Sequence, residues 1–222
     1  MNEANVLEEK FSPTLRTFVA LAREKLYREP QIADSWQPRD FVSGDHKLNP
    51  EFDEAHISKA PRPAAVLVPI VAHDEPTVLL TQRSQHLSTH AGQVAFPGGR
   101  IDPGDASPLA AALREADEEI GLPARFATPL GYLDSYLSGT GFRIVPVVAL
   151  IEPGFTLRIN PDEVDEAFEV PLSFLMTREN HAKRSGVWKG VERHFYAMPF
   201  EQRNIWGATA GMIRNLYERL YE

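Results

Sequence analysis

The sequence has no cysteine among its 222 residues. A disulfide framework and thiol chemistry of any kind are therefore excluded. No apolar run approaches the ~20 residues that a membrane-spanning helix needs, and the acidic start, Met1 to Lys10, lacks the basic and apolar segments of a secretory signal. We therefore expect a cytoplasmic protein without a membrane partner.

The chain also has fewer basic than acidic residues. The chain has 23 Lys and Arg against 31 Asp and Glu, which gives a formal net charge of −8 at pH 7. This balance argues against a general nucleic-acid binder, because such proteins usually present a basic face. It is compatible with a phosphorylated ligand, since metal ions and a few local arginines can supply a positive field.

The most informative stretch runs from Phe96 to Leu122. It begins with a glycine pair after Pro97 and continues through an acidic loop. Ser107 can cap a helix that has Pro108 in its first turn, and Gly121 can end that helix in a left-handed conformation. One side of the helix is apolar and is predicted to face the core: Leu109, Ala112, Leu113, Ala116 and Ile120.

Three glutamates, Glu115, Glu118 and Glu119, occupy another side of this helix. Like charges at such spacings cost stability, and Arg114 can offset only part of that cost. A hard divalent cation, Mg²⁺ or Mn²⁺, is the stronger explanation, because these ions prefer carboxylate and carbonyl oxygens. A solvated acidic face would be favoured for these residues alone, but it does not explain the glycines on both sides of the helix.

The segment resembles a Nudix box. The pattern is Gly, five residues, Glu, seven residues, Arg-Glu, an apolar residue, any residue, Glu-Glu, any residue, Gly and an apolar residue. The loop acid here is Asp105, and eight residues separate it from Arg114. The other positions of the pattern are filled by Gly99, Arg114, Glu115, Ala116, Glu118, Glu119, Gly121 and Leu122.

These departures resemble one branch of the family, the coenzyme A pyrophosphatase-like hydrolases. That branch also carries a motif upstream of the box, which residues 80–84 (LTQRS) and 90–99 (HAGQVAFPGG) match nearly continuously. Ser88 departs from the motif, because the branch often has a basic residue there. A later segment, Ile205 to Ala210, resembles the same branch.

The resemblance implies a metal-dependent hydrolase that cleaves the pyrophosphate of a nucleoside diphosphate derivative. Coenzyme A or a derivative is the expected substrate, cut to a phosphopantetheine and adenosine 3′,5′-bisphosphate. We expect Mg²⁺ or Mn²⁺ as the cofactor, with Glu115, Glu118 and Glu119 as ligands. The resemblance adds the backbone carbonyl of Gly99 to that set.

The remaining catalytic roles are less specific. Arg114 is expected to orient a glutamate through a charge-assisted contact. Glu118, Glu119 or a late acid, Glu163 or Glu166, is expected to be the base that deprotonates water. The sequence does not assign this role to one acid, because coupled carboxylates share their titration. The substrate-binding candidates are Arg83 at a strand end, His90 and Arg100. A surface ion pair for Arg83 and a structural hydrogen bond for His90 are the competing interpretations.

Two other functions compete with this one. The same chemistry could act on ADP-ribose, a dinucleotide polyphosphate or a nucleoside triphosphate, because fold and box do not decide the substrate. A catalytically silent nucleotide-binding domain is the other alternative. The full Arg114-Glu115 and Glu118-Glu119 set argues against it, since a binder does not need every metal ligand.

The pattern as a whole predicts an α/β or α+β domain with a mixed sheet between helices, which the resemblance sharpens to the Nudix α/β/α sandwich. We divide the chain into an N-terminal helix and extended arm (1–63) and a hydrolase domain (64–222). The arm makes a homodimer plausible. Pro146 is expected at a sheet edge or bulge. The predicted helices are 11–28, about 107–120 and 205–221, and the predicted strands are 64–71, 77–82, 129–137, 142–151, 181–187 and 193–199.

Overall fold

The computed structural model describes residues 11–32, 43–50, 60–188 and 190–222. Its helices are α2 (Pro13–Lys25), α3 (Pro108–Ile120), α4 (Leu172–Leu175) and α5 (Ala208–Tyr221), with 3-10 turns η2 (Asp45–Lys47), η4 (Ala124–Phe126) and η5 (Arg178–Asn180). The main sheet contains β1 (Ser43–Gly44), β2 (Arg62–Val71), β3 (Thr77–Arg83), β4 (Val94–Ala95), β5 (Gly98–Arg100), β6 (Ala127–Tyr132), β7 (Tyr136–Leu137), β8 (Phe142–Ile151) and β9 (Val164–Pro171). A smaller sheet contains β10 (Ala182–Trp188), β11 (Val191–Phe200) and β12 (Arg203–Trp206).

The main sheet is mixed. Its spine runs β1-β7-β8-β2-β3-β4. Strand β2 lies parallel to β8 over its whole length and antiparallel to β3 and β5. Strand β9 pairs antiparallel with β3, so the segment after residue 160 returns to the strand that precedes the box.

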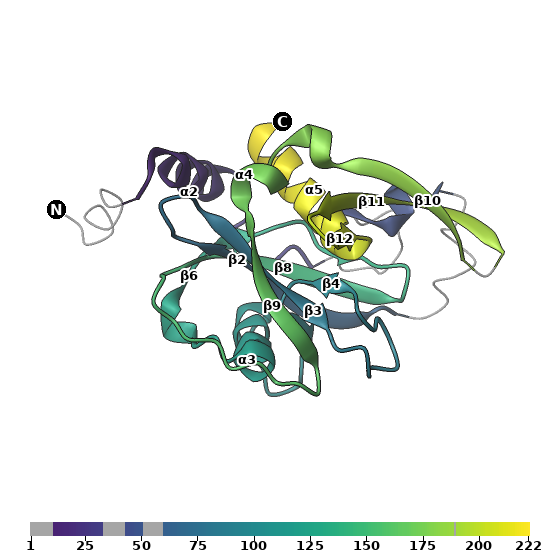
Figure 1. The fold of residues 1–222 in the computed structure, drawn as a ribbon, viewed down its shortest axis with the longest axis horizontal. Helices are drawn as coiled ribbons and strands as arrows, with labels where there is room; N and C mark the ends of the chain where they lie inside the picture. Colours follow the sequence, from purple (N-terminus) through teal and green to yellow (C-terminus); the bar gives the residue numbers. More distant parts are fainter. Residues whose placement is uncertain (1–10, 33–42, 51–59, 189) are drawn as a thin grey trace.

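Both faces of this sheet are covered, as the alternation of side chains along β2 shows. Leu67 and Val71 pack in a cluster with the apolar side of α3. Val68 and Ile70 point the other way, into a cluster with α2 and α5. Figure 1 shows α3 on one side of the sheet and α2 and α5 on the other. The predicted α/β/α sandwich with a mixed sheet is confirmed.

The ends of α3 follow local rules. Ser107 Oγ accepts a hydrogen bond from the Ala110 amide at 3.1 Å, and Pro108 occupies the first turn. Gly121 ends the helix with φ 66°, where a Cβ atom would clash with Arg158. These caps confirm the predicted limits of the helix.

Two predictions about the later chain are wrong. Pro146 is neither at a sheet edge nor in a bulge: it lies within β8, paired with Val66 of β2. On the side away from β2, Pro146 faces the break between β6 and β7. Its carbonyl accepts a hydrogen bond from the Leu133 amide at 3.1 Å. Because the neighbouring strand is interrupted there, the N–H that proline lacks is not needed for a hydrogen bond between strands. Ile205 belongs to β12, because the helix starts only after Gly207 at φ 64°.

The N-terminal helix is confirmed and shares a core with the rest of the chain. Leu15 and Phe18 of α2 lie in the same buried cluster as Met212 and Ile213 of α5. The predicted arm, 29–63, falls in part outside the described residues; within it, β1 pairs in parallel with β7. The division at residue 63 stays a prediction. None of the helices in the described part of the chain is long and apolar enough to cross a membrane.

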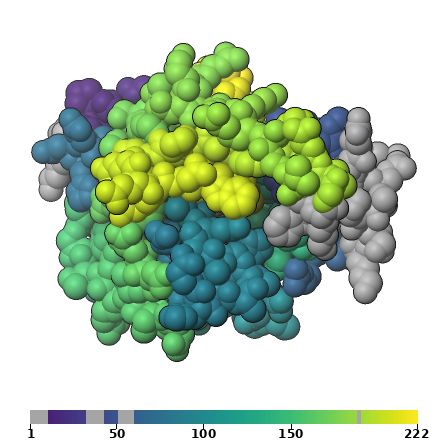
Figure 2. Space-filling view, turned by 45° about the vertical axis from the view of Figure 1, so that its right-hand side comes forward, coloured from purple at the N-terminus to yellow at the C-terminus, as the bar shows by residue number. Residues whose placement is uncertain are grey.

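The C-terminal part lies against the strands that lead into the box. Thr209 Oγ1 donates to the Val94 carbonyl at 3.0 Å, which ties the start of α5 to β4. In the space-filling view the yellow C-terminal residues adjoin the blue-teal surface formed by the β3–β5 region (Figure 2). This contact sets the position of the segment between β3 and β5, which contains the motif upstream of the box.

Candidate active site

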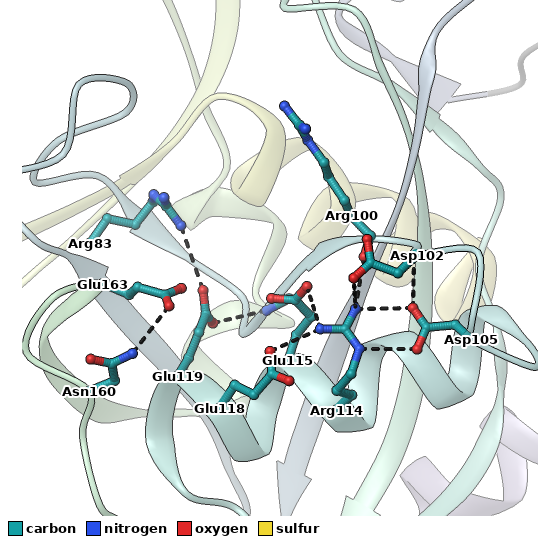
Figure 3. Close-up of polar contacts among 11 residues, drawn as sticks. Arg83, Arg100, Asp102, Asp105, Arg114, Glu115, Glu118, Glu119, Asn160 and Glu163 are labelled. Carbon is teal, nitrogen blue, oxygen red and sulfur yellow. Dashed lines mark hydrogen bonds and ion pairs between the residues drawn. The ribbon is translucent and has the colours of Figure 1, made fainter.

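The glutamates of α3 lie close to β5 and to the end of β3. The helix is held on the sheet by small buried side chains, Ala111, Ala112 and Ala116, together with Ile120. This close packing brings the polar side of the helix next to the Gly98–Arg100 strand and the end of β3 (Figure 3). Helix and upstream motif therefore form one site.

Glu119 is the most buried acid of the box. Its side chain is 3% exposed, against 15% for Glu115 and 55% for Glu118. Its Oε2 accepts from the Gly98 amide at 3.0 Å, and its Oε1 lies 3.6 Å from Arg83 Nη1. Burial raises the pKa of Glu119 to about 7, although the Gly98 hydrogen bond and the Arg83 charge oppose the shift.

Glu115 lies directly against the glycine pair. A Cβ atom on Gly99 would come within 2.5 Å of the Glu115 carboxylate, so only glycine leaves room for it. Glu115 Oε1 also contacts Arg114 Nη1 at 3.0 Å. Burial raises the pKa of this carboxyl group, and Arg114 opposes the rise.

Arg114 connects the loop to the helix. Its Nε and Nη2 each donate to Asp105 at 3.0 Å, and Nη1 donates to Glu118 Oε2 at 2.9 Å. Nη2 also donates to the carbonyl of Arg100 at 3.1 Å. The hydrogen bonds from Arg114 hold the pKa of Asp105 below its usual value. Arg114 therefore contacts several acidic side chains and one backbone carbonyl. Its role in orienting a metal-binding glutamate stays a prediction.

The two late acids lie in different surroundings. The carbonyl of Glu163 accepts from the Ser84 amide at 2.9 Å, and its carboxylate accepts from Asn160 Nδ2 at 3.2 Å. Figure 3 shows that carboxylate directed toward Glu119, and the charge of Glu163 contributes to the raised pKa of Glu119. Asn160, which was not selected from the sequence, lies three residues before Glu163.

Glu166 is directed elsewhere. Its carboxylate accepts from Arg203 Nη2 of β12 at 2.6 Å. The same guanidinium stacks on Phe168, two residues farther along β9, at 4.2 Å from the ring centroid. Ala167, between them, packs in the cluster around α3. Glu166 therefore lies on the face of β9 opposite α3.

The substrate-binding candidates also differ in position. Arg83 is part-buried and pairs with Glu119 in the site. His90 adopts φ 59° in an exposed turn, where its Nδ1 forms a 2.9 Å hydrogen bond with Gln93. The Arg100 side chain is exposed and makes no hydrogen bond or ion pair with the described residues; Figure 3 shows it pointing away from the carboxylates.

The donor set has the chemistry of a divalent-metal site, although its acids are turned toward arginines. In the residues that the structure describes, no three acidic or histidine side chains are arranged so that they could hold a metal ion together. Yet the buried Glu119 lies close to the charges of Glu115 and Glu163, and the part-buried Glu115 lies close to those of Glu118 and Glu163. Gly99 provides a cradle that a Cβ atom would fill. Oxygen ligands of this kind suit Mg²⁺ or Mn²⁺.

Comparisons with known proteins identify relatives of this chain. The NUDIX domain profile matches residues 61–189. The chain is similar to the uncharacterized Nudix hydrolase NudL of Escherichia coli K12, with 42% identity over 177 residues that cover 80% of this chain and 91% of that protein. Among solved structures, DR0079 from Deinococcus radiodurans has a TM-score of 0.48 at 15% identity, covering 76% of this chain and 88% of that one.

A second solved structure is the NUDIX domain of Shewanella oneidensis NrtR complexed with ADP ribose. It has a TM-score of 0.47 at 21% identity and covers 79% of this chain and 96% of that one. The domain match and the identity to NudL carry the assignment. The chain therefore belongs to the Nudix hydrolase family, whose members are pyrophosphohydrolases that typically use divalent metal ions.

Proposed function

We propose that this Nudix pyrophosphohydrolase cleaves coenzyme A or a derivative at its pyrophosphate, giving a phosphopantetheine and adenosine 3′,5′-bisphosphate. The observation that supports this most is the contact between Arg83 and Glu119. Arg83 belongs to the upstream motif that resembles the coenzyme A branch, and Glu119 belongs to the box. The two motifs therefore act on one ligand.

In this proposal Glu115, Glu118 and Glu119 would hold a divalent cation together with the carbonyl of Gly99. Such an ion would supply positive charge that offsets two adjacent phosphates, and it would lower the pKa of bound water. Arg114 keeps the loop and the helix in register through Asp105 and the Arg100 carbonyl. Its contacts reduce the freedom of the acids before substrate arrives.

Glu163 is the late acid that we favour as the proton acceptor. Its carboxylate faces Glu119, whereas Glu166 is paired with Arg203 on the other face of β9. Asn160 orients Glu163 by its 3.2 Å hydrogen bond. Glu118 and Glu119 stay alternatives, because acids in contact share their protons.

Arg83 and Arg100 are the proposed contacts to the substrate phosphates. Arg83 lies in the site. Arg100 directly follows Gly99, and its exposed side chain is unpaired within the described part of the chain. His90 contributes through the turn it forms with Gln93. A cytoplasmic location and a homodimer stay predictions.

The test is hydrolysis of coenzyme A, 3′-dephospho-coenzyme A and ADP-ribose side by side, each with Mg²⁺, Mn²⁺ or chelator. Metal-dependent cleavage that favours coenzyme A supports the proposal. A preference for ADP-ribose would keep the chemistry and reject the substrate. Ser88 is exposed in the loop after β3, so the dephospho substrate also reports whether a 3′-phosphate is recognised without a basic residue there.

A further inference from the structure

Glu119 depends on Arg83 for its counter-charge. The carboxylate is 3% exposed, and the Arg83 guanidinium, 25% exposed, is the cation that contacts it in the described part of the chain. The arginine of the box is already engaged, because Arg114 contacts Asp105, Glu115 and Glu118. An ionised carboxylate this buried is costly without a partner.

The two oxygens of Glu119 are not equivalent. Oε2 accepts from the Gly98 amide at 3.0 Å, and Gly98 is fixed by its pairing with Val66 in the sheet. Oε1 faces Arg83 Nη1 at 3.6 Å, a longer contact to the end of a flexible side chain. Among the residues that the structure describes, Arg83 Nε is buried without a hydrogen-bond partner, so this guanidinium is incompletely satisfied where it lies. Oε1 is thus the exchangeable position.

The strand geometry directs Arg83 to this place. Arg83 is the last residue of β3, and the pairing of β3 with β9 shifts register between Gln82 and Arg83. A shift of this kind re-aims the side chains beside it. The backbone of Arg83 is held by Gln93 and Gly92 through hydrogen bonds of 2.9 Å and 3.0 Å. Only its side chain is therefore free to change partner.

We propose that Arg83 is an exchangeable counter-ion of Glu119, which neutralises the carboxylate in the metal-free enzyme and turns to the substrate phosphates when a divalent cation takes its place. The inference rests on the proposed function and adds an order of events to it. Arg83 and the cation compete for Oε1, because two positive charges at one oxygen repel. A phosphate that captures Arg83 must in turn strengthen metal binding, since coupling is reciprocal.

The experiment is Mn²⁺ binding without substrate, measured by titration calorimetry and by the loss of the free-Mn²⁺ electron paramagnetic resonance signal. Arg83→Gln removes the competitor and should tighten Mn²⁺ binding about three- to tenfold, as expected for a part-exposed ion pair. Arg83→Lys keeps the charge and should stay close to wild type. Arg100→Gln is the matched control, because it removes an arginine charge at the end of β5, close to the site, from a side chain that points away from Glu119.

The Mn²⁺ dependence of the Tm deficit is a readout that a purely structural arginine would not change. With chelator, Arg83→Gln leaves Glu119 unpaired and should lower Tm. With saturating Mn²⁺ the deficit should disappear or reverse, because the ion replaces the lost charge. A deficit that is equal in both conditions would mean a structural role and would overturn the inference.

The outcomes separate the inference from the proposed function. Unchanged or weaker Mn²⁺ binding by Arg83→Gln, in a wild type that binds Mn²⁺ and hydrolyses coenzyme A, would overturn the inference alone. Absence of Mn²⁺ binding in every variant and in wild type would overturn both the metal site and the inference. Equal tightening by Arg100→Gln would show a general field effect and also reject the exchange.

Discussion

The guanidinium of Arg114 donates to both carboxylate oxygens of Asp105, each across 3.0 Å. Asp105 also accepts from the amide of Asp102 at 2.8 Å, so it ties the loop before α3 to the arginine of the box. The shorter acid is accommodated although one more residue separates it from Arg114 than the box pattern allows. A planar, two-point contact of this type fixes orientation as well as charge.

Asp105→Asn should lower both activity and stability, because it removes the charge and one acceptor of this contact. We expect kcat to fall about tenfold, the lower end of the range for partners that orient metal ligands. Asp102→Asn is the control, since Asp102 is 66% exposed and 3.8 Å from Arg114. Steady-state kinetics and Tm of the two variants test this prediction. Equal losses of kcat and Tm in both variants would show that the contact between Asp105 and Arg114 is no more important than that of Asp102.

Gly99→Ala should displace Glu115 while the protein stays folded. The new Cβ atom would lie 2.5 Å from the carboxylate, which is the end of a flexible side chain and can swing away at little cost. We expect Mn²⁺ affinity to fall roughly tenfold with a small change in Tm. Gly104→Ala is the matched control, because nothing lies within 4 Å of its Cβ position. Wild-type Mn²⁺ affinity in Gly99→Ala would show that metal binding does not need the space that Gly99 leaves for the Glu115 carboxylate.

Glu119→Gln should keep the fold and remove most metal-dependent hydrolysis. The amide preserves the shape of the side chain but deletes the charge of a proposed ligand. We expect kcat to fall at least about a hundredfold, measured with saturating Mg²⁺ and with circular dichroism to confirm folding. Near-normal turnover in this variant would remove Glu119 from the metal site.

The metal-free protein should lose stability as the pH rises through 7. Burial raises the pKa of Glu119 to about 7 from 4.5, so between these values the folded chain binds a proton that the unfolded chain lacks. That contribution is complete below about pH 4.5, decreases as the pH rises from about 4.5 to about 7, and is absent above that; its size is roughly 3 kcal/mol.

Urea unfolding in chelator at several pH values tests this, with Glu119→Gln as the reference that cannot titrate. The stability of the variant relative to wild type should increase from pH 5 to pH 8. Parallel curves for the two proteins would mean that Glu119 titrates at its ordinary pKa.

Glu163→Gln should reduce kcat far more than Glu166→Gln. The Glu163 carboxylate faces Glu119, whereas Glu166 binds Arg203 at 2.6 Å on the opposite face of β9. General-base removal typically costs about 10²–10⁴-fold, so the two variants should separate clearly. The pH–rate profile of each gives a second readout. A greater loss of kcat in Glu166→Gln would favour Glu166, a base candidate named from the sequence, over Glu163.

Much of the box helix could be predicted from the sequence because its determinants are local. Ser107, Pro108 and Gly121 define its ends through contacts within a few residues, and the helical period separates its apolar side from its acids. The buried strands β2 and β8 were also predictable, since continuous apolar runs identify them. Nothing beyond the chain neighbours was needed for these elements.

The wrong predictions arise from information that a local pattern does not contain. Pro146 is tolerated inside β8 because the strand beside it breaks between Tyr132 and Tyr136. Ile205 continues the apolar spacing of α5, yet Gly207 turns the chain and β11 captures that segment as a strand. In both places pairing with a neighbouring strand, rather than the apolar pattern of the segment itself, determines the outcome.

The same division holds for the site. The sequence alone determined which residue types were available, namely the glutamates of α3, Arg114 and the glycine cradle, because their spacing is set by one helix and one turn. Only the tertiary structure decided that Arg83 meets Glu119 and that Glu163, not Glu166, faces the acids. The reason is physical: the register of β9 against β3 sets which face each side chain occupies, and strand pairing over some eighty residues follows no local rule.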